Sequence, residues 1–206
     1  MAEPYRQLPA EKRRRILDAA LEEFAKKDYK SASTDDIAAR AGISKGLLFY
    51  YFKNKQSLYL ALAEETKERI EGHLKLQKMR QITDFFDILE FGVQKKLHYL
   101  KNIPWMLEFS LRMYYASGND FGVRLQRYTT GLIDLMCRQY FAQVDLEKFK
   151  PGRTPRQALD LLMYLADGYC HMQRMAGNKL DLDAMMAEYC QWRDMVKQYV
   201  YKEEYQ

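Results

Sequence analysis

Apolar residues recur along most of the chain at intervals of three and four positions, which is the period of an amphipathic helix. The first such stripe lies in residues 16–25 and follows Pro9, a residue that suits a first helical turn. No segment alternates between apolar and polar residues as a half-buried strand does. The pattern therefore predicts an all-α protein of about nine helices, the first of which ends near residue 27.

Two of the predicted helices are short and are separated by a single glycine turn. Ser33 or Thr34 can cap the first of them, which should end at Gly42, and Ser44 can cap the second, over residues 45–52. Longer helices precede and follow this pair. The arrangement is typical of a helix-turn-helix, in which the second short helix enters the major groove of DNA.

The rest of the chain is also predicted to be helical, and it is rich in Tyr, Phe, Met and Trp. Glycine, proline and asparagine mark the breaks, for example across residues 117–120 and at Gly177. Apolar stripes on the last two helices can either pack on the chain's own helices or form a seam with a second copy. The expected helices cover residues 55–78, 82–100, 103–117, 119–143, 155–176 and 181–203.

The charge of the chain is modest but unevenly placed. The net charge is +5, and residues 1–60 hold 12 Lys and Arg against 8 Asp and Glu, whereas the remaining residues are nearly balanced. A positive surplus in one segment is compatible with binding to nucleic acid. Residues 12–15 form a basic cluster, which is either a solvated helix start or a phosphate contact.

Neither a membrane segment nor a secretory signal is predicted, because no apolar run approaches ~18 residues and the first residues are charged. Three cysteines without a CxxC pair indicate free thiols in a reducing compartment. We therefore expect a cytoplasmic protein that makes no contact with a membrane.

Motifs for catalysis are missing from the sequence. The three histidines, His73, His98 and His171, have no metal-ligand spacing, and no Walker loop, GxGxxG or GxSxG sequence occurs. The sequence therefore predicts a protein that is not an enzyme, with no metal site and no cofactor.

The groups suited to a DNA contact are concentrated between Ser33 and Lys55. Hydroxyl groups at helix starts and lysines can grip phosphates, a glycine allows close approach to the groove, and Tyr51 can reach a phosphate. Most apolar residues in this segment and just after it are expected to form core rather than contacts, namely Ile37, Ala38, Ile43, Leu48, Tyr50, Phe52 and Leu58.

The sequence TDDIAARAGISKGLLFYYFKNKQSL of residues 34–58 resembles the signature of the TetR/AcrR family of regulators, and RILDAALEEF of residues 15–24 resembles that family's first helix. The resemblance implies a helix-turn-helix DNA-binding domain in residues 1–55 and an effector-binding and dimerisation domain in residues 56–206. With the helix caps, the implied DNA contacts are Ser33, Thr34, Ser44, Lys45, Gly46, Leu47, Phe49, Tyr51 and Lys55.

Three positions depart from the family pattern. Phe49 stands where tyrosine is usual and Leu47 where threonine is common, so the reading helix lacks two hydroxyl groups. Both side chains can still touch thymine methyl groups or sugars. Asp28 replaces a usual glycine, and aspartate tolerates a left-handed backbone better than most residues do.

The resemblance implies a ligand-responsive regulator, by default a repressor, that binds a palindromic double-stranded DNA operator as a homodimer through its last two helices. A small effector, largely apolar or aromatic, is expected to release the DNA by shifting the population of conformations. The alternatives are an architectural DNA-binding protein without an effector and a helical protein-interaction module. The candidate effector contacts, which can instead be plain core or ion pairs, are Phe86, Trp105, Phe109, Arg112, Met113, Tyr128, Asp167 and His171.

Overall fold

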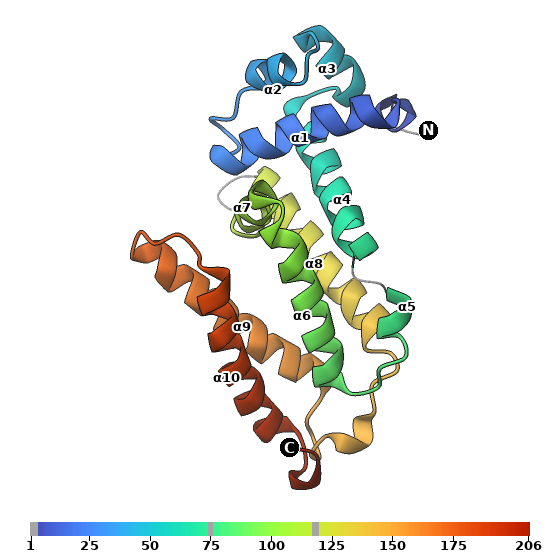
Figure 1. Ribbon diagram of the computed structural model, residues 1–206, viewed down its shortest axis with the longest axis vertical. Coiled ribbons are helices and arrows are strands. Elements are labelled where there is room, and N and C mark those ends of the chain that lie inside the picture. Colours follow the sequence, from blue (N-terminus) through green and yellow to red (C-terminus); the bar gives the residue numbers. More distant parts are fainter. Residues whose placement is uncertain (1–3, 74–75, 117–119) are drawn as a thin grey trace. The chain divides into compact units, whose positions relative to one another are not determined.

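The computed structural model describes residues 4–73, 76–116 and 120–206, and within these ranges the chain is built of helices and their connections (Figure 1). The β pairing that these residues show is limited to an isolated antiparallel bridge between Phe149 and Tyr201. The all-α prediction is confirmed. The α-helices are α1 (Ala10–Lys26), α2 (Thr34–Arg40), α3 (Lys45–Phe52), α4 (Lys55–His73), α5 (Leu76–Met79), α6 (Phe85–Lys101), α7 (Pro104–Tyr114), α8 (Asp120–Tyr140), α9 (Pro155–Met175) and α10 (Leu182–Val200). Short 3-10 helices are η1 (Pro4–Gln7), η2 (Leu146–Lys148) and η3 (Glu203–Tyr205).

The ends of the helices differ from the prediction by a few residues. The helix expected over 103–117 ends at Tyr114, and the helix expected over 119–143 ends at Tyr140. The break expected at 117–120 falls mainly on residues 117–119, which lie outside the described ranges. Residues 74–75, in the helix expected to run to about residue 78, also lie outside them, and the helix is described as α4 and α5 on either side.

Side-chain caps begin three consecutive helices. Ser33 Oγ accepts the backbone N–H three residues further on at 3.2 Å, and Ser44 Oγ does the same at 3.2 Å. Asn54 Oδ1 accepts the corresponding N–H at 2.8 Å and begins α4. Each cap satisfies one of the N–H groups that a helix start leaves unpaired, which is worth about 1 kcal/mol. The two cap predictions at Ser33 and Ser44 are confirmed.

Contacts within the chain divide it into two compact units. The first comprises residues 1–74 and 98–133, and the second comprises residues 75–97 and 134–206. The helix-turn-helix segment therefore shares a unit with α4, α7 and the first part of α8. The predicted division at residue 55 concerns function rather than packing, and it stays a prediction.

The first unit is held together by apolar faces of α1, α2, α3 and α4. Each helix contributes a side chain that is almost fully inaccessible, namely Ile16, Ile37, Leu48 and Leu58. Burying side chains of this size stabilises a fold by about 1.5–3 kcal/mol each. An aromatic cluster continues this core through α4 and α7 to the start of α8 and includes Phe24, Tyr29, Tyr59, Phe109 and Phe121.

The second unit has its own aromatic core near the start of α6. The Phe86 and Tyr201 rings pack edge to face with their centroids 5.0 Å apart, and the Phe149 and Tyr201 rings do so at 4.8 Å. The backbone N–H of Phe85 donates to Tyr201 Oη at 3.2 Å. The residue that follows α10 is thereby fixed against the start of α6.

Candidate nucleic-acid interface

The turn between α2 and α3 needs a glycine for its backbone conformation. Gly42 has a φ of 67°, in the left-handed region that a side chain disfavours, although a Cβ there would meet no atom within 4 Å. Gly42 N–H donates to Ala39 O at 3.1 Å and Ile43 N–H to Ala38 O at 3.0 Å. These two bonds form a Schellman motif, which ends α2 and directs the chain into α3.

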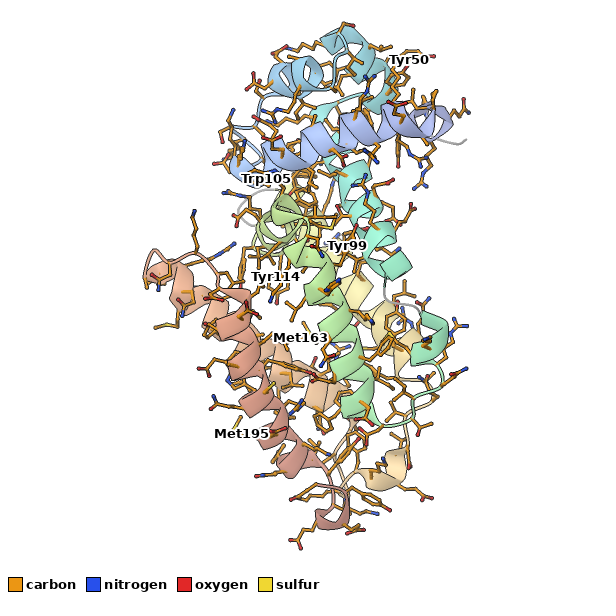
Figure 2. All side chains as sticks on the ribbon, in the orientation of Figure 1. Tyr50, Tyr99, Trp105, Tyr114, Met163 and Met195 are labelled. Atoms are coloured by element: carbon orange, nitrogen blue, oxygen red, sulfur yellow. The ribbon has the colours of Figure 1, made fainter. Side chains whose placement is uncertain are left out.

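The short helix α3 has a buried side and an exposed side. Leu48 and Phe52 are buried and anchor the helix, whereas Lys45, Gly46 and Tyr50 are exposed. The prediction that Tyr50 belongs to the core is wrong, because its side chain is 69% exposed and projects from α3 (Figure 2). A Tyr-Tyr-Phe run suggests packing, but only residues on the inner side of a helix can pack. Leu47, Phe49 and Tyr51 are half-buried and lie beside the exposed surface.

Lys45, the first residue of α3, forms an ion pair with α2. Its Nζ donates to Asp35 Oδ2 at 2.9 Å, and both side chains are more than half exposed. An exposed pair of this kind is easily exchanged for another anion. Lys45 therefore stands at the surface with a weakly held counter-charge.

Tyr51 has a basic partner on α1. Lys12 Nζ donates to Tyr51 Oη at 3.3 Å, and the same ammonium lies 5.4 Å from the centroid of the Tyr51 ring. The pair places a positive charge beside the hydroxyl group that was predicted to reach a phosphate. Lys12 was not among the individually named contacts, but the basic cluster of residues 12–15 was the sequence signal for it.

Lys55 lies differently from the prediction of a phosphate contact. Its Nζ donates to Ala32 O at 2.6 Å and to Lys30 O at 3.1 Å, and it lies 5.0 Å from the centroid of the Tyr29 ring. Burial lowers the pKa of the ammonium, although the carboxylates of Asp28 and Glu23 act in the opposite direction. The side chain is directed into the α1–α2 connection.

The remaining predicted contacts lie at the amino ends of α2 and α3. Ser33 and Thr34 are half-buried at the start of α2, and Ser44 is exposed at the start of α3. Backbone N–H groups at such positions favour anions. Ser33 and Ser44 are occupied as caps, so the hydroxyl group of Thr34 is the one not used in capping its own helix.

The α1–α2 connection does not use the left-handed backbone considered for Asp28. Asp28 has no positive φ; its Oδ1 accepts both the N–H and the hydroxyl of Ser31, each at 2.7 Å. The hydrogen bonds from Ser31 hold the pKa of the Asp28 carboxyl below its usual range. A side-chain turn thus replaces the glycine turn.

The candidate effector residues divide between the two units. In the first unit, Phe109 and Met113 are buried, Tyr128 Oη donates to Glu64 Oε2 at 2.6 Å, and Trp105 lies under the Lys26 ammonium at 4.8 Å. In the second unit, Phe86 is buried in the aromatic core, Asp167 is half-buried and His171 is exposed. Their role as effector contacts stays a prediction.

Arg112, another candidate effector residue, is turned towards α1. Its Nε donates to Ala25 O at 2.8 Å and lies 3.1 Å from Glu108 Oε1. Ala25 O is one of the carbonyls that a helix end leaves unpaired. The guanidinium group therefore caps the carboxyl end of α1.

The described ranges contain no group of three His, Cys, Asp or Glu side chains that could hold a metal ion. Similarly, none of the helices described is at once long enough and apolar enough to cross a bilayer.

The second unit carries an exposed apolar surface on α9. Leu161, Tyr164, Met172 and Met175 lie on one side of this helix, spaced by three and eight residues, and Tyr164 is 71% exposed. On α10, Met195 is also exposed (Figure 2), and so is Tyr199, one turn further along the helix. Apolar stripes were predicted on both helices, and Met195 belongs to the one predicted on α10. The exposed side of α9 is opposite to its predicted stripe, whose residues are buried or half-buried, namely Leu159, Leu162, Met163, Ala166 and Tyr169.

The fold and the exposed side of α3 together define a helix-turn-helix unit followed by a helical region. Residues 16–62 match the family described as "Bacterial regulatory proteins, tetR family". This segment of the chain is therefore similar to the tetR family, as the sequence resemblance implied.

A curated relative and two solved structures illustrate the similarity. The HTH-type transcriptional activator FasR of Mycolicibacterium smegmatis is 35% identical over 99 residues, which are 42% of this chain and 45% of FasR. The chain spans less than half the length of the curated relatives it matches. FadR of Bacillus subtilis, solved in complex with stearoyl-CoA, has a TM-score of 0.66 and 19% identity, with 89% of this chain and 96% of that chain covered. SmeT, the repressor of a Stenotrophomonas maltophilia multidrug efflux pump, has a TM-score of 0.67 and 18% identity, with 97% of this chain and 93% of that chain covered. The two structures establish similarity of fold.

Proposed function

We propose that the protein is a DNA-binding transcriptional regulator that docks α3 in the major groove. The observation that carries the proposal is the exposed side of α3, where Lys45, Gly46 and Tyr50 stand on a helix anchored by buried Leu48 and Phe52. A short helix presented in this way can approach base edges with its first turn. A DNA-binding role would place the protein in the cytoplasm with the chromosome.

The proposed DNA contacts fall into two classes. Gly46, Leu47, Phe49 and Tyr50 face the groove, where apolar and aromatic side chains can touch thymine methyl groups. Lys45 contacts either a base edge or a phosphate, depending on how far its ammonium group moves away from the Asp35 carboxylate. The groups proposed to hold phosphates are Ser33, Thr34, Ser44, Tyr51 and, added by the structure, Lys12.

We also propose a homodimer joined through α9 and α10. The exposed apolar side chains on these helices would be covered in a seam of four helices, and two reading helices would then fit a palindromic site. Exchanging Tyr164 for aspartate should shift the species measured by sedimentation from dimer to monomer. A wild-type chain that sediments as a monomer at micromolar concentration would contradict the proposal.

We propose in addition that a small apolar effector releases the DNA. The related folds support this, because FadR was solved with stearoyl-CoA and SmeT with triclosan. A ligand that favours one conformation raises the melting temperature and lowers the operator affinity together. Repression is the proposed direction, and a reporter gene behind the selected site tests it, since FasR is named an activator.

The experiment that tests DNA recognition is selection from random duplexes, followed by titration of the selected site by fluorescence anisotropy. We expect one near-palindromic sequence that binds at least a thousandfold more tightly than random duplex at moderate salt. Tyr50→Ala should lose most of this ratio, whereas Lys179→Ala, at an exposed lysine outside the helix-turn-helix, should not. Enrichment of no sequence would refute the proposed function.

A further inference from the structure

The connection between α1 and α2, residues 27–33, is held by two oppositely charged side chains that come from different helices. Glu23 on α1 binds the end of the connection that leads into α2, and Lys55 on α4 binds its middle. The connection has no regular secondary structure to satisfy its backbone groups. Charged side chains supply the hydrogen bonds instead.

Lys55 uses its ammonium group on this connection in three ways. Two N–H groups are directed to the carbonyls of Ala32 and Lys30, at 2.6 and 3.1 Å, and the charge lies 5.0 Å from the centroid of the Tyr29 ring. An ammonium group has three donors and no acceptor, so two carbonyls and a ring face account for its usual capacity. To reach a phosphate, Lys55 would have to leave both carbonyls without their partner.

The position of Lys55 in α4 makes this use of the side chain informative. It is the first residue of α4, where the helix dipole disfavours a positive charge. Two carbonyl oxygens aligned on the ammonium compensate for that unfavourable location. A lysine is therefore suited to this position because of the connection it holds.

Glu23 acts on the other end of the same connection. Its side chain is 2% exposed, and Oε1 accepts the backbone N–H of Ser33 at 2.9 Å and lies 2.8 Å from Lys27 Nζ. Burial alone raises the pKa of this carboxyl, but the bonds from Lys27 and Ser33 and the charge of Arg40 outweigh it, and the pKa is lowered. Glu23 thus stays ionised while it holds the residue that caps α2.

We propose that Lys55 is a positioning residue for DNA recognition and that Glu23 is its counterpart. Together they fix the connection that leads into α2, and through α2 and the Gly42 turn they set the direction of α3. This inference rests on the proposed function, and it removes Lys55 from the phosphate contacts that the sequence predicted. The connection thereby links the first turn of α4 to the first turn of α2.

The experiment compares variants of Lys55 that separate charge from hydrogen bonding. Lys55→Met keeps the aliphatic stem but has neither charge nor donors, whereas Lys55→Gln has no charge and keeps an amide that can donate to the carbonyls. The probe is the duplex selected by the wild-type chain, titrated at several salt concentrations well below the melting temperature. Lys30→Met is the matched control, because it removes a charge from the same connection and leaves the carbonyl of residue 30 in place.

Positioning predicts that Lys55→Met binds the selected duplex about tenfold more weakly, while the slope of log K against log salt is unchanged. Lys55→Gln should recover part of that loss. Lys55→Met should also bind random duplex nearly as well as the wild type does, because only the direction of α3 has changed.

Other outcomes overturn the inference. A slope lower by about one unit in both Lys55 variants, with glutamine no better than methionine, would make Lys55 a phosphate contact. A lower melting temperature with unchanged affinity and base preference would make its role purely structural. If the wild-type chain selects no sequence, the proposed function fails before the variants are compared, so the two failures are distinguishable.

Discussion

Replacing Asp35 with asparagine should make the protein less stable and a better DNA binder at the same time. In the free protein Asp35 holds Lys45, the first residue of the reading helix, at 2.9 Å. DNA must displace that carboxylate before Lys45 can contact it. Removing the negative charge frees the lysine in advance and also removes a repulsion between Asp35 and the phosphates.

The size of the effect follows from the geometry and exposure of the pair. Two unit charges 2.9 Å apart in water attract by roughly 1.4 kcal/mol. Fixing two long exposed side chains and screening by salt reduce this to about 0.2–1 kcal/mol. The affinity for the selected duplex should therefore rise by a factor of roughly 1.4 to 5. Asp35 also lies in the first turn of α2, so its loss should reduce the free energy of unfolding by about 0.3–1 kcal/mol.

Anisotropy titrations at three salt concentrations measure the first effect, and urea denaturation measures the second. Asp36→Asn is the matched control, because Asp36 lies in the same turn but pairs with Lys27 at 3.2 Å instead of with α3. It should have a similar cost in stability and a smaller effect on affinity. If Asp35→Asn binds no better than the wild type, or if the two variants bind alike, Lys45 does not exchange Asp35 for DNA and the reasoning is wrong.

Three further predictions concern stability. Lys53 follows α3 with a φ of 61° and lies in a γ-turn, in which the N–H of Asn54 donates to Phe52 O at 2.7 Å. Lys53→Gly should raise the free energy of unfolding by about 1 kcal/mol, because the backbone strain relieved exceeds the unfolded-state entropy that glycine adds. Lys30→Gly is the control, since φ is negative there, and a gain of the same size in that variant would refute the strain at Lys53. Arg112→Met should lower the free energy of unfolding by about 1–2 kcal/mol, because Ala25 O loses its partner. Glu108→Gln should change the free energy of unfolding little. Equal losses for the two variants in urea denaturation would assign the effect to the ion pair between Arg112 and Glu108. The bond from Lys148 and the N–H groups of Asp87 and Phe86 outweigh burial and lower the pKa of Asp84, so its stabilising effect should be complete above the unfolded pKa of about 3.9 and be lost as the pH falls through the lower, folded pKa. Asp84 Oδ1 caps α6 by accepting the N–H groups of Phe86 and Asp87 at 2.9 and 3.1 Å. Asp84→Asn should keep this cap and remove the pH dependence, and an unchanged pH profile in thermal melts would contradict the prediction.

Features that depend on a few neighbouring residues were predictable from the sequence. The caps at Ser33 and Ser44 and the turn at Gly42 involve hydrogen bonds between residues no more than five positions apart. Their donors and acceptors can be read directly from residue types and spacing. The same applies to the helices themselves, whose apolar period is local.

Features that depend on distant partners were not predictable. Lys55 finds its carbonyl partners 23 and 25 residues away, and Arg112 finds Ala25 at a separation of 87. The sequence marks both as cations and gives no sign of where they point. Tyr50 shows the reverse case, since an aromatic side chain predicts burial unless its side of the helix is known to face outward.

The hydrogen bond between Phe85 N–H and Tyr201 Oη has a consequence for the order in which the chain folds during synthesis. The two residues are 116 positions apart, and the aromatic core that they share cannot close until residue 201 has left the ribosome. The contacts among α1, α2, α3 and α4 need no residue beyond the end of α4, so they can form while the rest is still being synthesised. Closing a loop of this length also slows folding more than it affects the final stability. In the nascent chain, helices α1 to α4 can therefore fold before the aromatic core of the second unit does. The apolar helices around Tyr201 are the part that most needs protection from aggregation during synthesis.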